Sequence, residues 1–373
     1  MLGSSSGDDL VCVVTTVKDT PENLDRFVER NLAGGADHLF VYVDDADEST
    51  YQRLGKKAHV TAVRTGAGYW HGQRPRSLNK RQWVNANLTN VLLTAFPEVR
   101  WLFHLDGDEE LDLDRDALLA LPPEIRAVRL GTLESVASAS SGRSPALFKR
   151  ELLPGELALL TTLGVISRPS NKVYFHGHTS GKSGIRPALD LRLGVHNVET
   201  TDRVEVEPFR ADWLHVLHHD SWSPEEFLRK WTEHLNPDNT ASFRNRKERL
   251  RAGLGTLAGL DIDESLRTEL LREIYRRNVA DEVELLGKLG FLVQPERTRH
   301  QHRPRGFSRA TRKNLDHRLQ RLRQLDKHAF FDRNAYAPRQ VVATLLAEAT
   351  SGSVQERLLA CSTQRDAAEG RPT

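Results

Sequence analysis

Short, β-rich apolar runs alternate with helical segments in the first 63 residues, and this order constrains the fold more than any other feature. Residues Leu10 to Val17 (LVCVVTTV) form a continuous apolar run, which is typical of a strand buried on both faces. Thr20 and the proline after it then favour the start of a helix. His38 to Val43 and His59 to Val63 are the next apolar runs. This β-α-β-α-β order predicts a Rossmann-like α/β sheet, whose ligands bind beyond the carboxyl ends of the strands.

The pattern of helices and strands continues to about residue 235 and then changes. We expect a helix over Leu78 to Phe96, strands over Trp101 to Leu105 and Trp213 to His219, and a helix after the capping box Ser223 to Glu226. Charged helical segments dominate from Asn236 onward. The chain is therefore divided into a disordered leader (1–9), a core domain (10–235) and a helical C-terminal extension (236–373) with a basic tract at 297–323.

Charge and hydropathy narrow the class of protein. A net charge of +2 over 373 residues does not favour specific nucleic-acid binding. No apolar run approaches the roughly 18 residues that span a bilayer, and the Gly/Ser-rich start lacks the features of a signal peptide. Cys12 and Cys361 form no disulfide framework and indicate reduced thiols. We expect a cytoplasmic protein whose basic tract is either a solvated surface or a peripheral contact with anionic lipid headgroups or another polyanion.

The strongest chemical signal is Asp106-Gly107-Asp108-Glu109, directly after the apolar run WLFHL. Two carboxylates one residue apart at the end of a buried strand are suited to a hard divalent cation that also binds phosphate oxygens. Such an ion neutralises the diphosphate of a sugar nucleotide as the sugar–phosphate bond breaks. The alternative is a simple acidic turn, because Asp-Gly is common in turns.

Two further groups of acids and histidines follow predicted strands. Asp44 and Asp45 end the second strand, where an acid accepts hydrogen bonds from a ribose or a base, or simply caps a turn. His215, His218, His219 and Asp220 end the last core strand, where one histidine is either a third metal ligand or a satisfied core residue.

Basic and amide side chains provide candidates for phosphate binding. The segment from Gly177 to Ser183 has three residues between its glycines where a Walker motif needs four, so that motif is rejected. Lys182 and Arg186 remain candidates for holding a diphosphate, against the alternative of a solvated loop. Lys80 and Gln82 begin the helix before the Asp-Gly-Asp strand, and they either bind the cofactor or form a solvated helix face.

These signals follow an order that resembles the family 2-like glycosyltransferases of bacteria. The likeness spans about residues 10–235, and its most specific part is the strand that ends in Asp-Gly-Asp-Glu. The matching residues are Lys18-Asp19, Gly35, Asp37-His38, Asp44 to Ser49, Gln82, Trp101 to Glu109, Gly181-Lys182-Ser183, Arg186, His196, His219 and Ser221 to Lys230.

The resemblance implies a GT-A fold with a three-layer mixed sheet, a nucleoside-diphosphate sugar donor and Mn²⁺ or Mg²⁺. By this likeness Asp19 and Asp45 lie near the nucleoside, and Lys18 is a further cofactor-binding candidate. Asp106 and Asp108 serve the ribose–phosphate and the metal, and His219 is the late metal ligand. Transfer to a saccharide or lipid-linked acceptor, with inversion at the anomeric carbon, is the expected reaction. The base must lie within hydrogen-bond reach of the acceptor hydroxyl, and Glu134 is the candidate.

Two other classes of function compete with this hypothesis. A nucleotidyltransferase or another phosphate-handling enzyme would use the same carboxylates, but the segment after the first strand, Val17 to Pro21, lacks the Gly/Arg/Lys-rich loop that a nucleotidyltransferase needs. A non-catalytic polyanion-binding protein would instead depend on the basic tract, and its binding would weaken with salt.

Overall fold

The structure is a computed structural model that describes residues 9–44, 48–138, 146–235, 245–295 and 302–327. Several predicted features lie outside the described residues: the leader up to residue 8, Asp45, Cys361, and the start and end of the predicted helical extension. Part of the basic tract, residues 297–301, lies outside them as well.

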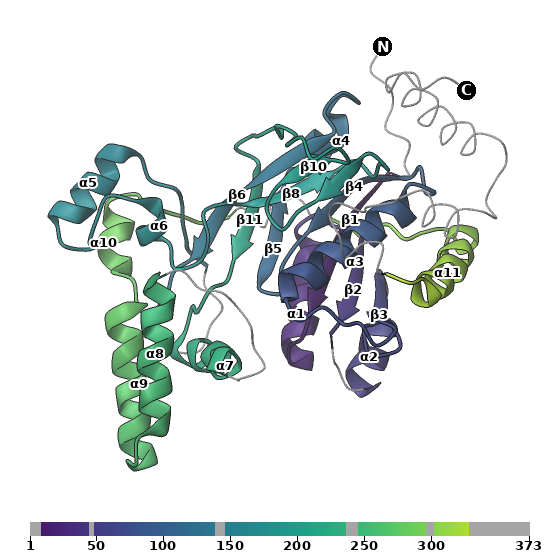
Figure 1. The fold of residues 1–373 in the computed structure, drawn as a ribbon. Coiled ribbons are helices and arrows are strands. Elements are labelled where there is room, and N and C mark those ends of the chain that lie inside the picture. Colours follow the sequence, from purple (N-terminus) through teal and green to yellow (C-terminus); the bar gives the residue numbers. More distant parts are fainter. Residues whose placement is uncertain (1–8, 45–47, 139–145, 236–244, 296–301, 328–373) are drawn as a thin grey trace, which may run out of the picture.

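The strands and helices follow one another in the order that the sequence predicts for the first hundred residues (Figure 1). The strands are β1 (Leu10–Val17), β2 (His38–Val43), β3 (Val60–Arg64), β4 (Val99–His104), β5 (Glu109–Leu113), β6 (Ala127–Ser135), β7 (Phe148–Lys149), β8 (Lys182–Ile185), β9 (Leu191–Leu193), β10 (Val198–Thr200), β11 (Leu214–His218) and β12 (Leu292–Val293). The helices are α1 (Pro21–Ala33), α2 (Glu48–Gly55), α3 (Leu78–Leu93), α4 (Arg115–Ala120), α5 (Pro154–Thr162), α6 (Asn171–Tyr174), α7 (Pro224–Leu235), α8 (Asn245–Gly259), α9 (Glu264–Asn278), α10 (Val283–Lys288) and α11 (Arg309–Gln324).

The central sheet is mixed and has a topological switch point between β1 and β4. Its main path runs β12-β7-β6-β8-β4-β1-β2-β3, and β11 pairs with both β5 and β6. Strands β4, β1, β2 and β3 are parallel, whereas β8 is antiparallel to both of its neighbours, β4 and β6. The chain moves outward from β1 to β3 and then returns to the other side of β1. Ligands of such sheets bind at the carboxyl ends of the strands where the order reverses.

Helices cover both faces of this sheet, because successive side chains of a strand point to opposite faces. Cys12 and Val14 of β1 belong to one core with α3 and α11, whereas Val11 and Val13 belong to a second core with α1, α2 and α4. This arrangement confirms the predicted α/β class, a three-layer Rossmann-like mixed sheet of the kind found in GT-A folds.

The described part of the predicted C-terminal extension is mainly helical. Helices α8 and α9 share a separate apolar cluster with α7, to which Phe227 and Tyr275 contribute buried rings. Strand β12 pairs with β7, and Leu315 and Leu319 of α11 pack into the core beside α3. The division of the chain at residue 235 stays a prediction. Among the described helices, none is long and apolar enough to cross a membrane.

Candidate functional site

The Asp106–Glu109 turn lies at the switch point, where β4 ends beside β1. A Cβ on Gly107 would lie 2.5 Å from Val17 Cγ2, so the turn approaches the end of β1 in a way that glycine alone permits. The Glu109 amide donates to the Asp106 carbonyl (3.1 Å), and the Asp106 amide donates to Glu109 Oε2 (2.7 Å). These bonds reverse the chain directly into β5, whose first residue is Glu109.

Asp106 is held by partners from α3 and β8. Its Oδ1 accepts from Gln82 Nε2 and its Oδ2 accepts from Lys182 Nζ, both at 2.6 Å. Lys182 has no exposed side-chain surface and also lies 3.2 Å from Glu109 Oε2. Burial lowers the pKa of Lys182, but Asp106 and Glu109 outweigh it and raise that pKa above the ordinary value. The structure thus brings together Asp106, Gln82 and Lys182, three of the residues that the sequence singled out.

Asp108 has a separate set of partners, on β11 and α7. Its Oδ2 accepts from Lys230 Nζ (2.8 Å) and lies 3.6 Å from His218 Nε2, and Lys230 also contacts Asp220. Burial raises the pKa of Asp108, but Lys230 and His218 outweigh it and hold that pKa well below its usual range. Burial likewise lowers the pKa of His218, but Asp108 and Glu134 outweigh it and raise that pKa to about 10.

Two groups of side chains among the described residues could hold a metal ion. One is Asp108, His218 and Asp220, and the other is Glu109, His178 and His218; within each group the ligand atoms lie within 4.8 Å of one another. Asp108 belongs to one group, whereas Asp106, on the other side of Gly107, belongs to neither. His218 belongs to both groups, so its imidazole is the centre of the potential metal chemistry.

Glu134 lies behind His218 and not on the open side of the site. Its carboxylate has no exposed surface, lies 3.8 Å from His218 Nδ1 and 2.9 Å from Lys149 Nζ, and accepts from the amides of His176 (2.7 Å) and Gly177 (2.5 Å). Burial raises the pKa of Glu134, but Lys149 and His218 outweigh it and lower that pKa. Glu134 is thus the carboxylate on the Nδ1 side of His218, at a distance longer than a hydrogen bond.

The backbone at Gly177 leaves room for the His218 ring, and replacing this glycine with alanine is expected to displace the ring. An added Cβ would lie closer than 3.0 Å to both the imidazole and Glu134 Oε2. Because contacts with Asp108 and Glu134 raise the pKa of His218, the displaced ring should titrate nearer the ordinary value of 6.5. NMR titration of the histidine Cε1 protons measures this. A His218 ring that is still protonated at about pH 8 in Gly177→Ala would contradict the prediction, and Gly155→Ala, with no atom within 4 Å, is the control.

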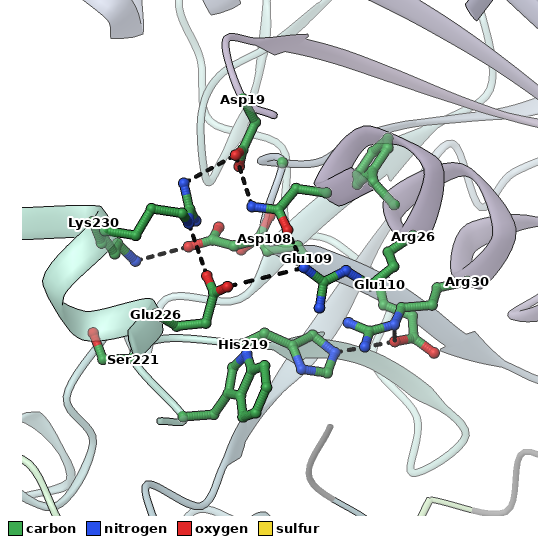
Figure 2. A pocket seen from close by; sticks show the side chains of 15 residues that line it. Asp19, Arg26, Arg30, Asp108, Glu109, Glu110, His219, Ser221, Glu226 and Lys230 are labelled. Atoms are coloured by element: carbon green, nitrogen blue, oxygen red, sulfur yellow. Dashed lines mark hydrogen bonds and ion pairs between the residues drawn. The ribbon is translucent and has the colours of Figure 1, made fainter. Parts of the chain in front are cut away.

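A charged pocket opens beside Asp108, between α1, the Asp106–Glu109 turn and α7 (Figure 2). Asp19 faces it and accepts from Arg229 NH1 (2.9 Å). His219 lines the same pocket, but its Nε2 contacts Glu110 Oε2 (3.0 Å). The lining residues are Asp19, Asn23, Arg26, Phe27, Arg30, Gly107, Asp108, Glu109, Glu110, His219, Ser221, Trp222, Glu226, Arg229 and Lys230.

His219, the predicted metal ligand, belongs to neither metal-capable group of the described residues. It follows the last residue of β11, and its amide donates to the Asp108 carbonyl (2.9 Å) while its side chain turns to Glu110. The neighbouring side chain, His218, takes the place beside the Asp108 carboxylate. The geometry therefore favours His218 over His219.

Asp44, Lys18 and Lys80 are further binding residues that the sequence predicts. Asp44 is buried, and its Oδ2 accepts from Arg81 Nε (2.8 Å) and Arg74 NH2 (3.0 Å), so its carboxylate is already engaged by two arginines. Lys18 and Lys80 have exposed side chains. Lys18 directly follows β1, and Lys80 lies on α3 two residues before Gln82.

Arg186 lies toward the opposite end of the sheet from Lys182. Strand β8 runs antiparallel to β4, so its two ends reach opposite edges. The guanidinium donates to the carbonyls of Leu121 (2.7 Å) and Ile125 (3.0 Å) and lies over the Trp101 ring, 4.6 Å from its centroid. The predicted pairing of Lys182 with Arg186 on one diphosphate is therefore not the arrangement that the structure has.

No role was assigned from the sequence to Lys230, which ends the matching segment Ser221 to Lys230, or to His178. A lysine in the middle of a charged amphipathic helix normally faces solvent, so no local signal gave Lys230 a role of its own. His178 lies in the histidine- and glycine-rich segment that was considered only for phosphate binding, and its Nε2 contacts Glu109 Oε1 at 2.9 Å. That unusual composition was the one available signal for His178.

Comparisons with known proteins add little to this geometry. No protein-family model matches the chain, and no curated protein matches it. The crystal structure of HddC from Yersinia pseudotuberculosis is 11% identical, with a TM-score of 0.33, over 59% of this chain and 97% of that one. The apo structure of the bifunctional glycosyltransferase WbbM is 14% identical, with a TM-score of 0.21, over 48% of this chain and 32% of that one. The likeness to a glycosyltransferase is thus weak, and scores this low carry no argument about function.

Proposed function

We propose that the protein is a metal-dependent glycosyltransferase that uses a nucleoside-diphosphate sugar. The observation that carries this proposal is the convergence of Asp108, His218 and Asp220, whose ligand atoms lie within 4.8 Å of one another. Asp108 follows β4 at the switch point of the sheet, where α/β folds of this kind bind nucleotides. The reaction that we propose transfers the sugar to a saccharide or lipid-linked hydroxyl with inversion.

The donor set fits a divalent cation. Two carboxylates and one imidazole suit Mn²⁺ better than Mg²⁺, since Mg²⁺ prefers oxygen ligands. Glu134 lies on the Nδ1 side of His218, which leaves Nε2 toward Asp108. We therefore propose Asp108, His218 and Asp220 as the ligands, with His218 in place of His219. A cation held there would neutralise charge on the diphosphate as the sugar–phosphate bond breaks.

The residues around this cluster receive proposed roles from their positions. Asp106, held by Gln82 and Lys182, lies on the other side of the same turn and is proposed to face the ribose–phosphate part of the donor. Asp19 lines the pocket beside Asp108 and is proposed to contact the nucleoside. Glu134 is proposed as a positioning residue for His218, because a base must reach the acceptor hydroxyl and this carboxylate has no exposed surface.

A thermal-shift screen of UDP-, GDP- and dTDP-sugars, with and without Mn²⁺, tests the proposal. A donor at about 100 times its Kd stabilises a protein by about 2.7 kcal/mol. For a chain of this size we therefore expect one nucleotide class to raise Tm by about 3 °C or more when Mn²⁺ is present. The same shift in EDTA would remove the metal from the proposal, and no shift with any sugar nucleotide would remove the donor. A larger shift with nucleoside triphosphates would favour a nucleotidyltransferase.

A further inference from the structure

Lys230 bridges the two carboxylates of the proposed metal site. It lies on α7, and its Nζ donates to Asp108 Oδ2 at 2.8 Å and to Asp220 Oδ1. Figure 2 shows its side chain directed from α7 toward Asp108. Both carboxylates also belong to the group that includes His218. The ammonium group therefore contacts the same two carboxylates that a divalent cation would need.

Electrostatics explains why a cation is needed there. Asp220 is almost fully buried, with 3% of its side chain exposed, and Asp108 is 33% exposed. Two carboxylates this close repel each other unless a positive group lies between them, and the repulsion grows as water is excluded. Lys230 supplies that charge from within the chain. A divalent cation and an ammonium group cannot both lie between these two carboxylates, because their positive charges would repel each other.

We infer that Lys230 is a resident cation that holds Asp108 and Asp220 together in the metal-free protein and competes with the divalent ion for them. This inference rests on the proposed function. Lys230 also lines the pocket beside Asp108, so the ammonium group that the ion displaces remains next to the proposed donor site. In that position the ammonium group contacts the oxygens of a diphosphate in place of the two carboxylates. Metal and donor then bind with positive coupling. The ion frees the ammonium group for the diphosphate, and the diphosphate stabilises the ammonium group that the ion displaces.

The direct test compares Mn²⁺ binding to the intact chain and to Lys230→Met, measured by electron paramagnetic resonance of free Mn²⁺. Methionine keeps much of the length of the side chain and removes the charge that competes with the ion, so we expect Mn²⁺ to bind at least about tenfold more tightly. Lys230→Arg keeps the charge and should bind Mn²⁺ no more tightly than the unaltered protein. The matched control is Lys288→Met, whose lysine is exposed and pairs with Glu284 one turn earlier on α10.

The second measurement adds UDP, which carries the diphosphate without a sugar to transfer. UDP should tighten Mn²⁺ binding in the unaltered protein, and the tightening should be smaller in Lys230→Met because no ammonium group is displaced. Circular dichroism of Lys230→Met establishes that the variant is folded, and Lys230→Gln replaces it if it is not. Equal or weaker Mn²⁺ binding in the folded variant overturns the inference.

The outcomes separate this inference from the proposed function. If donors bind with Mn²⁺ but Lys230→Met has the same Mn²⁺ affinity as the unaltered protein, the inference fails and the glycosyltransferase proposal stands. If Lys230→Met binds Mn²⁺ more tightly but no sugar nucleotide binds to either protein, the inference stands and the proposed function fails. Absence of Mn²⁺ binding in both proteins overturns both.

Discussion

Asp108→Asn is expected to lower the rate of Mn²⁺-dependent transfer from the sugar nucleotide by at least about 100-fold. The substitution keeps the shape of the side chain but removes the negative charge that a divalent cation requires. Folding should be preserved, because the side chain is 33% exposed and Lys230 retains its contact with Asp220. Release of the nucleoside diphosphate, followed by liquid chromatography, measures the rate, and thermal unfolding verifies the fold.

A neighbouring aspartate provides the matched control. Asp112 lies on β5, is 25% exposed and faces His215 at 3.9 Å, so it also pairs with a histidine of β11 but outside the cluster. Asp112→Asn should retain nearly full activity. Full activity in Asp108→Asn would remove Asp108 from the metal assignment. Loss of activity with unchanged Mn²⁺ affinity would assign Asp108 to the substrate and not to the ion.

The fold of the first hundred residues was predictable because its strands are buried on both faces. The run Leu10 to Val17 became β1 without change, since a continuous apolar β-rich run has few other ways to be buried. Strand β8 was not predicted, because Lys182 and its glycine-rich neighbours are typical of a solvated loop. Lys182 lies inside the sheet only because Asp106 and Glu109, more than seventy residues away, neutralise its charge. Local patterns do not contain such pairings.

The residues of the candidate site that follow a recognisable strand could be predicted. Those whose position depends on how the strands pair with one another could not. Asp106 and Asp108 follow a strand that the sequence identifies, so their place at the sheet edge could be derived. The choice between His218 and His219 depends on how β11 pairs with β5 and β6, which the sequence does not reveal. Arg186 was misplaced for the same reason, since the antiparallel direction of β8 carries it to the other edge.

Lys149→Met is expected to lower the free energy of unfolding by about 3–5 kcal/mol, which is typical of breaking a buried ion pair on one side. The Lys149 side chain has no exposed surface, and its Nζ lies 2.9 Å from Glu134 Oε1 and 3.0 Å from Asp281 Oδ1. Methionine would remove the ammonium group that both buried carboxylates contact. Urea denaturation followed by circular dichroism measures the loss, and Lys288→Met, on the exposed face of α10, should change stability by less than about 0.5 kcal/mol.

The pH dependence of this loss distinguishes charge from packing. Lys149 helps to hold the pKa values of Glu134 and Asp281 below their usual range, so in the variant these pKa values should rise. A group with a lowered folded-state pKa stabilises the protein above its unfolded pKa and loses that effect as the pH falls. The difference between the two proteins should therefore be largest near neutral pH and shrink below about pH 4, where the carboxylates accept protons. If the unaltered protein and the variant differ in free energy of unfolding by the same amount near neutral pH and at acid pH, the loss would come from packing. Because Asp281 follows α9 and Glu134 lies behind His218, the charge-based result would also mean that the C-terminal segment supports the candidate site.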